Sequence, residues 1–272
     1  MRYCWSGSKF LLWALPFVLV APGLLPAQAA PYEFSLIDAG SGLTLHKEMF
    51  LQPFTYSNKY DGKQTEVVFQ LSGKYQILGS RLYLGYTQIS YWQAYDLKNS
   101  SPFRETNYNP ELFYRFQKRG TGAGLLGADV GFEHESNGQA VPLSRSWNLL
   151  FAAPYWQGDN WLAYVKLRYR IPESAKETPE SGEGDDNPDI TDYLGWSDVH
   201  LYYHFPNCSL VHLLMRGYIG TDKGLFSLKW SVPLLSFENT WLVISGSSGY
   251  GESLADYNRS VNRVGIGVMF NR

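Results

Sequence analysis

The feature that most constrains the fold of this 272-residue chain is a two-residue alternation between apolar and polar side chains. In residues 161–171, Trp161 and Val165 fall on one face of an extended strand, whereas Lys166 and Arg170 fall on the opposite face. The alternation recurs in segments of about ten residues, the length that a tilted membrane-spanning strand needs. Beyond the N-terminal region no apolar run approaches the ~20 residues of a spanning helix, so the pattern favours strands.

We predict an all-β fold, a twelve-stranded antiparallel transmembrane β-barrel, because about twelve such segments follow one another. The predicted strands span residues 46–55, 64–76, 81–92, 109–118, 123–136, 146–156, 161–171, 194–205, 209–219, 224–234, 240–250 and 261–270. The longer linkers are residues 93–108, 137–145, 172–193 and 251–260. They alternate with tight turns, which in an up-and-down barrel places the long loops on one rim and the short turns and both termini on the other.

A soluble β-sandwich or a lipocalin-like barrel would also alternate. Aromatic residues make up 16% of this chain, with 20 Tyr, 15 Phe and 9 Trp, and this content suits aromatic girdles at two membrane interfaces. A soluble fold would not need a surface rich in Trp and Tyr opposite a face that carries basic residues. The membrane barrel is therefore the favoured interpretation.

Residues 1–29 have the pattern of a secretory signal peptide. Basic residues precede an apolar core over residues 10–20, and an Ala-x-Ala cleavage site follows. A retained membrane anchor is the alternative, but the apolar core is shorter than a spanning helix. We predict a signal peptide over 1–29 and a transmembrane β-barrel domain over 30–272. Because Cys4 would leave with the signal peptide, Cys208 is expected to have no disulfide partner.

One predicted strand, residues 123–136, carries chemically reactive groups on its apolar face. His134 and Ser136 share that face with Phe132, while the acidic residues lie on the other face. This polarity is unusual for a soluble enzyme, but it suits a lipid hydrolase because the reactive groups would face the substrate. A histidine and a serine at a membrane interface can also simply hydrogen-bond lipid head groups, and the pattern alone leaves that alternative open.

The next predicted strand brings a third polar group to the same place. If the intervening hairpin is centred near Val141, Asn148 lies opposite His134. Ser146 then lies opposite Ser136, and cross-strand partners point to the same side of a sheet. A serine hydroxyl is a poor nucleophile until a base takes its proton, and the base needs a third group to orient it. An amide can do so without placing a charge against lipid.

Several spaced blocks of sequence carry a family resemblance. They are His134-Glu135-Ser136-Asn137-Gly138, Ser144-Arg145-Ser146-Trp147-Asn148, and residues 86–88, 100–108, 185–190 and 249–254. Together they resemble the outer-membrane phospholipase A family, in the same order and over essentially the whole mature chain. The resemblance implies a bacterial outer-membrane enzyme that hydrolyses acyl esters of phospholipids and lysophospholipids, with A1 and A2 specificity, in the outer leaflet.

The resemblance also implies roles for individual residues. Ser136 would be the nucleophile, His134 the general base and later acid, and Asn148 the group that orients His134. The main-chain N–H of Gly138 would stabilise the oxyanion. The family enzyme is active as a calcium-bound homodimer and inactive as a monomer, which implies one Ca²⁺ per active site at the dimer interface.

For calcium the resemblance implies oxygen ligands, which Ca²⁺ prefers. They would be the Ser144 hydroxyl, the main-chain oxygen of Gln139, and the main-chain oxygen of Ser100 of the partner subunit. The family's best-known members carry arginine where this chain has Gln139. A main-chain ligand survives that difference, but the local charge is less positive, so calcium affinity could differ.

The resemblance further implies that Gln88 lies at the dimer interface and that Trp92 and Tyr108 border the substrate groove. An inward-facing Gln88 in the barrel lumen is the alternative, because the predicted strand 81–92 is apolar on both faces. Interfacial aromatic residues are also common in barrels of every function.

Other functional classes are a passive pore and a structural barrel that anchors envelope proteins. Inward charged residues could fill a twelve-stranded lumen with salt bridges, which disfavours conduction. An anchor would have no esterase activity. The net charge of −2 gives no basic excess for nucleic-acid binding, and the acidic residues of the 172–193 linker fit a solvated outer loop better than an EF-hand.

Overall fold

The computed structural model describes residues 34–272 apart from 39, 61–62, 120–123, 179, 218–222 and 235–238, so the predicted signal peptide lies outside the described residues. The strands are β1 (Leu43–Thr44), β2 (Met49–Ser57), β3 (Thr65–Gln76), β4 (Leu82–Trp92), β5 (Phe103–Arg119), β6 (Leu125–Ser136), β7 (Ser146–Gln157), β8 (Trp161–Arg170), β9 (Ser197–His204), β10 (Leu210–Arg216), β11 (Leu225–Pro233), β12 (Trp241–Gly249) and β13 (Val261–Asn271). The helical elements are η1 (Ser35–Ile37), η2 (Leu97–Asn99) and α1 (Thr191–Leu194). No helix in the described part of the chain is long and apolar enough to cross a membrane.

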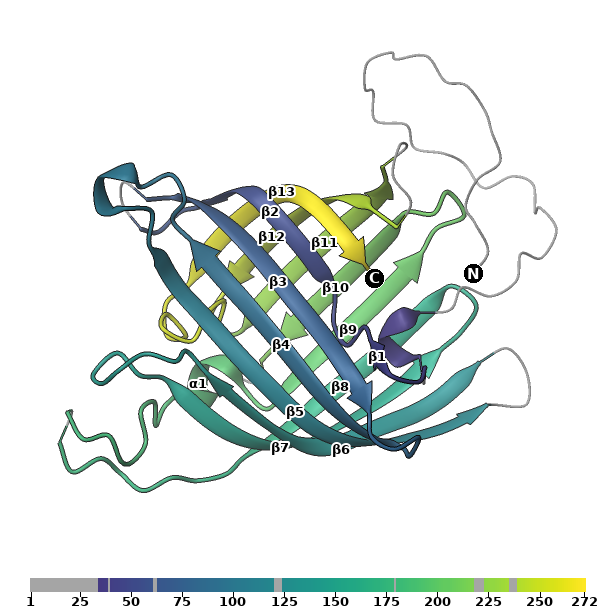
Figure 1. Ribbon diagram of the computed structural model, residues 1–272, viewed down its shortest axis with the longest axis horizontal. Coiled ribbons are helices and arrows are strands. Elements are labelled where there is room, and N and C mark those ends of the chain that lie inside the picture. Colours follow the sequence, from purple (N-terminus) through teal and green to yellow (C-terminus); the bar gives the residue numbers. More distant parts are fainter. Residues whose placement is uncertain are drawn as a thin grey trace, which may run out of the picture.

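Strands β2 to β13 form one closed antiparallel barrel (Figure 1). Each strand pairs with the next along the chain, and β13 pairs with β2 to close the ring. β1 does not add a strand to the ring. It pairs with Lys74 and Tyr75 at the end of β3, beyond the residues of β3 that pair with β2. The predicted twelve-stranded antiparallel barrel is therefore confirmed.

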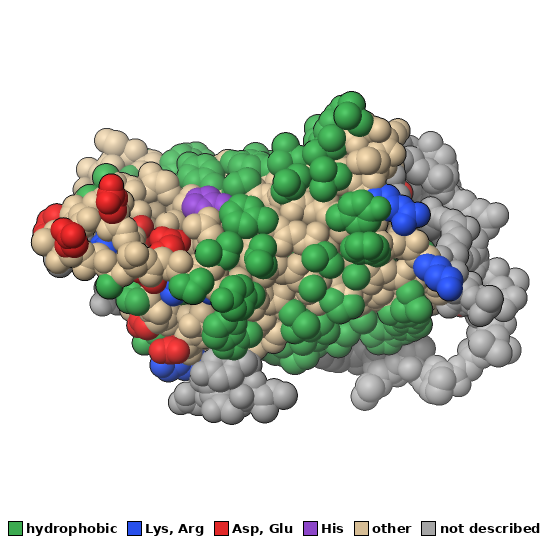
Figure 2. Space-filling model, turned by 90° about the horizontal axis from the view of Figure 1, so that it is seen from below, with side chains coloured by type: hydrophobic (Ala, Val, Ile, Leu, Met, Phe, Trp, Pro, Cys, Tyr) green, Lys and Arg blue, Asp and Glu red, His purple; other side chains and the backbone are tan. Residues whose placement is uncertain are grey.

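The faces of the strands follow the alternation in the sequence. Outward Leu112 is 43% exposed while its inward neighbour Glu111 is 2% exposed, and Leu167 at 50% precedes Arg168 at 8%. Figure 2 shows hydrophobic side chains spread over the barrel wall, with charged side chains gathered towards its two ends. An apolar band between polar rims is the surface that a bilayer requires.

Long loops and short turns lie at opposite ends of the barrel. The β8–β9 loop, which contains α1, is at one end, and the C-terminus is at the other (Figure 1). The loops β4–β5, β6–β7 and β12–β13 share the rim of the β8–β9 loop, because an up-and-down topology returns every second connection to the same side. The predicted separation of long loops from short turns is confirmed.

Several strand boundaries differ from the sequence prediction, and two of them have a clear structural reason. β5 begins at Phe103 rather than at residue 109, because its ladder with β4 continues to the rim. The strand predicted over 194–205 starts later, since α1 precedes it. Ile190 and Leu194 are 0% and 2% exposed and lie one helical turn apart, so burial at the rim selects a helical turn there.

The prediction for the cysteines is wrong. Cys208 is disulfide-bonded in the structure, although the sequence predicts that it has no partner. The only other cysteine of the chain, Cys4, lies outside the described residues.

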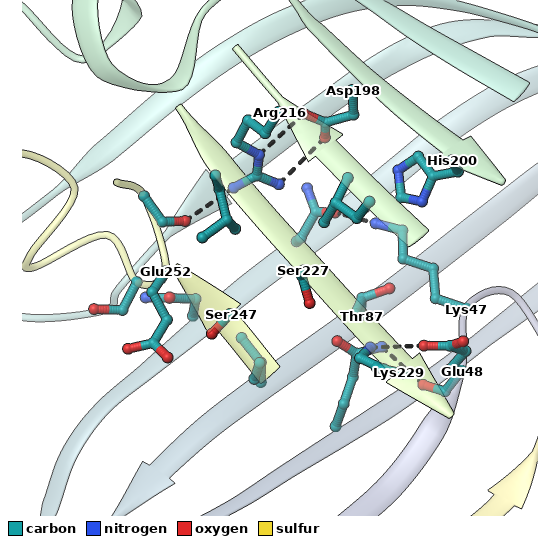
Figure 3. A pocket seen from close by; sticks show the side chains of 18 of the residues that line it. Lys47, Glu48, Thr87, Asp198, His200, Arg216, Ser227, Lys229, Ser247 and Glu252 are labelled. Carbon is teal, nitrogen blue, oxygen red and sulfur yellow. Dashed lines mark hydrogen bonds and ion pairs between the residues drawn. The ribbon is translucent and has the colours of Figure 1, made fainter. Parts of the chain in front are cut away.

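Paired charges occupy the lumen around an interior cavity of about 270 Å³. Figure 3 shows two of these pairs in the cavity wall, Lys229 with Glu48 and Arg216 with Asp198. Their N–O distances are 2.6 and 3.0 Å. All four side chains line the cavity wall. A buried charge is tolerated only with a partner. The pair of Arg216 with Asp198 joins the adjacent strands β10 and β9, and the pair of Lys229 with Glu48 joins β11 to the segment that precedes β2.

Residues 34–38 and 40–48, here named the plug segment, lie at the short-turn end of the barrel. The Lys74 side chain is 0% exposed and donates to the main-chain oxygen of Leu36 at 3.1 Å and to that of Leu45. Apolar side chains of the plug segment pack against Tyr155, Leu162, Tyr202 and Leu210. The plug segment and the charge pairs narrow the lumen around this cavity, which argues against an open solute channel.

The outward face gives a first testable prediction. Replacing Ile266 with arginine is expected to destabilise the barrel by about 2–4 kcal/mol in a bilayer, because it forces a charge onto the lipid-facing wall near mid-strand. Ile266 is 42% exposed and lies between outward Ile244 and Phe54 on the neighbouring strands. Urea titration of protein folded into lipid vesicles measures the free energy of unfolding.

The matched control is Leu78→Arg, because Leu78 is 97% exposed in the β3–β4 turn. A charge at the interface costs only about 0–1 kcal/mol. If both arginine variants unfolded at the same urea concentration, the wall around Ile266 would not face lipid.

Candidate active site

Strands β6 and β7 bring an imidazole and an amide together. They pair so that Asn148 lies opposite His134, as the sequence predicts. Ser146 likewise lies opposite Ser136. Trp147 is 0% exposed and points into the barrel, so the alternation of the strand turns Asn148 outward. The predicted register between these two strands is confirmed.

His134 and Ser136 lie on the outward face of β6. Val130 and Phe132 share this face and are 45% and 39% exposed, whereas Glu133 is 4% exposed and lines the interior cavity. His134 and Ser136 are themselves partly buried. Because the strand ends at Ser136 on the long-loop side, both polar groups lie at the upper margin of the outward face.

A hydrogen bond joins the imidazole to the amide. His134 Nδ1 and Asn148 Oδ1 are 2.9 Å apart. The amide oxygen can only accept, so Nδ1 carries the proton and Nε2 is the unprotonated nitrogen that a base presents to a hydroxyl. Within the described residues no hydrogen bond joins His134 to Ser136, and such bonds often tighten only when substrate binds. The arrangement supplies an oriented base on the same strand face as a hydroxyl.

The sequence reasoning missed one residue that contacts this constellation, Glu173, and one that shapes the adjoining loop, Asn137. Asn148 Nδ2 donates to Glu173 Oε1 at 3.1 Å. Asn137 is 2% exposed, and its side chain binds across the 137–145 loop, donating to the Leu143 main-chain oxygen at 3.0 Å and accepting from the Arg145 N–H at 2.9 Å. Asn137 stands inside the quoted His134-to-Gly138 block, so a buried loop-closing amide could have been suspected there. Glu173 has no comparable local signal.

Gly138 is the second residue of the loop that follows Ser136. Its φ of +63° is a left-handed conformation, which glycine adopts without a Cβ penalty. A Cβ there would also lie 2.9 Å from the Tyr108 ring. The Gly138 N–H donates to no acceptor within the described part of the chain, so it is available to a ligand near Ser136.

A row of outward side chains runs across β4, β5 and β6 beside the site. Register pairs Gln88 with Tyr108 and Tyr108 with Ser136. Gln88 contacts Tyr86 Oη at 3.1 Å and Ser90 Oγ at 3.2 Å. Thr87, Ile89 and Tyr91 line the interior cavity, so the alternation turns Gln88 outward and the inward alternative is excluded.

Trp92 lies at the end of β4, near the long-loop rim. Its ring stacks on Phe103 with centroids 5.6 Å apart, and its Nε1 donates to the Ser101 main-chain oxygen at 2.8 Å. This anchors the β4–β5 loop that carries Ser100. Ser100 is exposed and has a left-handed φ of +61°, so its main chain is open to a neighbouring molecule.

The oxygen atoms predicted to bind calcium have a suitable chemistry. The Ser144 hydroxyl donates to Asp186 Oδ2 at 2.6 Å, which leaves its lone pairs for a cation. The Gln139 carbonyl accepts no hydrogen bond from the described residues. Hard oxygen donors with a carboxylate nearby fit Ca²⁺. The described residues contain no cluster of three or more His, Cys, Asp or Glu suited to a metal, so hydroxyl and main-chain oxygens would have to serve.

The acidic β8–β9 loop is more than a solvated loop, which corrects the interpretation from sequence. Four of its carboxylates bind other groups: Glu173 binds Asn148, Asp185 binds Arg170, Asp186 binds Ser144 and Lys176, and Asp189 binds Tyr257. Burial raises the pKa of Tyr257, which keeps its hydroxyl protonated as a donor. The loop therefore packs over the rim beside the site.

Comparison with known proteins identifies the family. The family model for phospholipase A1 matches residues 39–270. The phospholipase A1 of Salmonella typhimurium is 38% identical over 258 residues, covering 90% of this chain and 82% of the relative. The phospholipase A1 of Escherichia coli K12 is 37% identical with the same coverage.

Two solved structures have the same fold. The outer membrane phospholipase A from Escherichia coli superposes with a TM-score of 0.73 at 34% identity, covering 84% of this chain and 94% of that chain. The Salmonella typhi outer membrane phospholipase, a dimer with bound calcium, superposes with a TM-score of 0.73 at 35% identity and covers 86% and 94%. The chain forms a closed barrel with an apolar outer face, and these relatives match it over nearly its whole described length. It therefore belongs to the phospholipase A1 family and is a phospholipase of the bacterial outer membrane.

Proposed function

We propose that this protein hydrolyses acyl esters of phospholipids and lysophospholipids, at the sn-1 and sn-2 positions, through a Ser136-His134-Asn148 triad that faces the outer leaflet. The observation that carries this proposal is the 2.9 Å contact between His134 Nδ1 and Asn148 Oδ1 on the outward face of the barrel. Calcium and a homodimer complete the active state. The decisive test is hydrolysis by the detergent-solubilised protein and its Ser136→Ala variant.

The chemistry follows the order of a serine esterase. Ser136 Oγ attacks the ester carbonyl while His134 Nε2 takes its proton, and the imidazolium then returns the proton to the leaving alcohol. Water repeats the sequence on the acyl-enzyme. Asn148 Oδ1 accepts from Nδ1 throughout and holds the ring in one tautomer. The N–H of Gly138 is the donor for the oxyanion, where a single preorganised donor contributes on the order of 10²–10³ in kcat.

The residues for calcium are the Ser144 hydroxyl, the Gln139 main-chain oxygen, and the main-chain oxygen of Ser100 of the partner subunit. One bound Ca²⁺ in each site would add positive charge beside the developing oxyanion. The free Gln139 carbonyl, the Ser144–Asp186 contact of 2.6 Å and the exposed position of Ser100 support this ligand set.

Dimerisation would complete the site. A hydrophobic outward face next to a catalytic group is only one wall of an acyl-chain groove, and a second barrel would supply the other wall and a metal ligand. Gln88 supports an interface here, because within the described residues its amide bonds only Tyr86 and Ser90 of its own strand and points outward in the same row as Tyr108 and Ser136. Polar side chains at membrane depth typically find partners on a neighbouring protein. Trp92 and Tyr108 would border the groove, and the monomer would be the resting state.

A passive pore and a structural anchor are less well supported. The plug segment and the lumen charge pairs oppose conduction, and neither class requires the contact between His134 and Asn148. An anchor would release no fatty acid from phospholipid, so the hydrolysis test separates it from the enzyme.

Ser144→Ala is expected to raise the calcium concentration for half-maximal hydrolysis by about 10–100-fold, a range typical for loss of a group that supports a metal site. Calcium titrations that record fatty-acid release and sedimentation together would measure it, with a chelator as the zero point. Ser80→Ala is the control, because Ser80 is exposed in the β3–β4 turn at the opposite rim. Overlapping calcium curves for wild type and Ser144→Ala would remove Ser144 from the ligand set.

A further inference from the structure

The amide of Asn148 has an orientation problem that the triad alone does not solve. A carboxylate in this position would present equivalent oxygens, whereas an amide rotated by half a turn presents its NH₂ group to His134. Nδ1 would then have to accept, and the proton would move to Nε2, leaving the imidazole unable to deprotonate Ser136. Something must therefore hold the amide with its oxygen towards His134.

Glu173 lies where it can hold the Asn148 amide in this orientation. Its Oε1 accepts from Asn148 Nδ2 at 3.1 Å, while Asn148 Oδ1 meets His134 Nδ1 at 2.9 Å. An ionised carboxylate has no proton to donate, so it binds only the NH₂ end of the amide. Among the described residues Glu173 forms no salt bridge, whereas Asp185 and Lys176 of the same loop do. Its carboxylate instead hydrogen-bonds Asn148.

Main-chain hydrogen bonds hold the backbone on both sides of Glu173, one to the site and one within the β8–β9 loop. The Ile171 N–H donates to the main-chain oxygen of Asn148 itself at 2.8 Å, which extends the β7–β8 pairing past the end of β8. The Asp185 N–H donates to the main-chain oxygen of Ser174 at 2.8 Å. Glu173 is thus held between two main-chain anchors and is partly buried, unlike the exposed Glu177 on the same loop.

We propose that Glu173 is a positioning residue for hydrolysis, which holds the Asn148 amide in the orientation that keeps His134 Nε2 free to accept the Ser136 proton. This inference rests on the proposed function. The carboxylate also lies behind the amide rather than against the imidazole, so a negative charge polarises the amide towards the imidazolium formed during attack. The charge itself stays in the loop, where it avoids the cost of exposure to hydrocarbon.

A double-mutant cycle tests this role. Glu173→Ala is expected to lower kcat for phospholipid hydrolysis about 10-fold or more and to leave KM within about twofold, because the substrate does not touch Glu173. Glu173→Gln keeps an acceptor oxygen and is expected to recover part of the loss. In an Asn148→Ala background, where no amide remains to be oriented, Glu173→Ala and Glu173→Gln are each expected to change kcat less than about twofold.

The matched control is Glu177→Ala, which removes a carboxylate from the same loop and is expected to retain wild-type kcat. Near-wild-type kcat in Glu173→Ala would overturn the inference, as would an equal loss in the presence and absence of the Asn148 side chain. If Glu173→Ala fails to fold, as judged by its circular dichroism, the Glu173→Gln pair decides by the same criterion. Unchanged hydrolysis in Ser136→Ala would instead overturn the proposed function, and the inference with it.

Discussion

Ser136→Ala is expected to lower kcat for phospholipid hydrolysis by on the order of 10⁴-fold or more, because it removes the oxygen that attacks the ester carbonyl. The main-chain N–H of Gly138 and the bound calcium would remain, so a residual rate above that of water is expected. The measurement is fatty-acid release from phospholipid in detergent micelles at saturating calcium. The fold should be unaffected, since Ser136 lies at the end of β6 on its outward face.

The control must remove an outward hydroxyl elsewhere on the barrel. Ser248 is exposed on β12 and hydrogen-bonds Asn262 at 2.6 Å, far along the sheet from β6. Ser248→Ala is expected to retain full activity. Reaction with a sulfonyl fluoride gives an independent readout, because wild type and Ser248→Ala should be labelled and Ser136→Ala should not.

Ser146 is the hydroxyl that could be confused with Ser136, since the two lie opposite one another on β6 and β7. Ser146 is farther from the proposed oxyanion donor in sequence, and its N–H is bound by Asn187 Oδ1 at 3.1 Å. If Ser146→Ala lost more activity than Ser136→Ala, the nucleophile would be Ser146 on β7 and not Ser136 on β6.

The fold could be predicted because each strand repeats one signal. A shift of a single residue moves every side chain to the opposite face, so the contrast between Leu112 and Glu111 fixes orientation as strongly as any motif. The same rule explains why the pairing of His134 with Asn148 was predictable once the hairpin centre was placed near Val141. Strands at membrane depth carry the pattern most clearly, since lipid and lumen select opposite residue types.

Connections and lumen contents were less predictable, because they depend on contacts between distant segments. The alternation of apolar and polar residues in β3 predicts that Lys74 faces the lumen. It does not predict that its partners are main-chain oxygens of the plug segment. Glu173 is one of several acidic residues in its loop, and nothing in its immediate sequence separates it from Glu177. Its contact with Asn148 arises only because the chain beyond β8 continues alongside β7.

Gln88 illustrates how a structure resolves an ambiguity in the sequence. Strand β4 carries apolar residues on both faces, so its alternation gives no orientation by itself. Thr87 and Ile89 line the interior cavity, so Gln88 between them faces outward. The register with Tyr108 then places Gln88 in the row that contains Ser136. An outward amide beside the site is the arrangement that a dimer interface there would use.

His134→Ala is expected to reduce kcat by on the order of 10⁴-fold, close to the loss in Ser136→Ala, because nucleophile and base act as one unit and their effects do not add. The double variant should therefore be no slower than either single variant. Asn148→Ala should cost less, since the imidazole remains and loses only its fixed tautomer and orientation. Fatty-acid release in detergent micelles measures all four variants. The rate of sulfonyl fluoride labelling at Ser136 should fall further in His134→Ala than in Asn148→Ala.

Added imidazole provides the control for the histidine variant. His134 faces outward and is partly exposed, so a small base can reach the space that the alanine leaves and should restore part of the activity of His134→Ala but none of Ser136→Ala. A His134 that only binds lipid head groups predicts a different pattern. Its removal would raise KM with little change in kcat, because it would weaken binding equally in the ground state and the transition state. That outcome would show that the contact between His134 and Asn148 has no role in hydrolysis, and the proposed triad would be wrong because Ser136 would have no base.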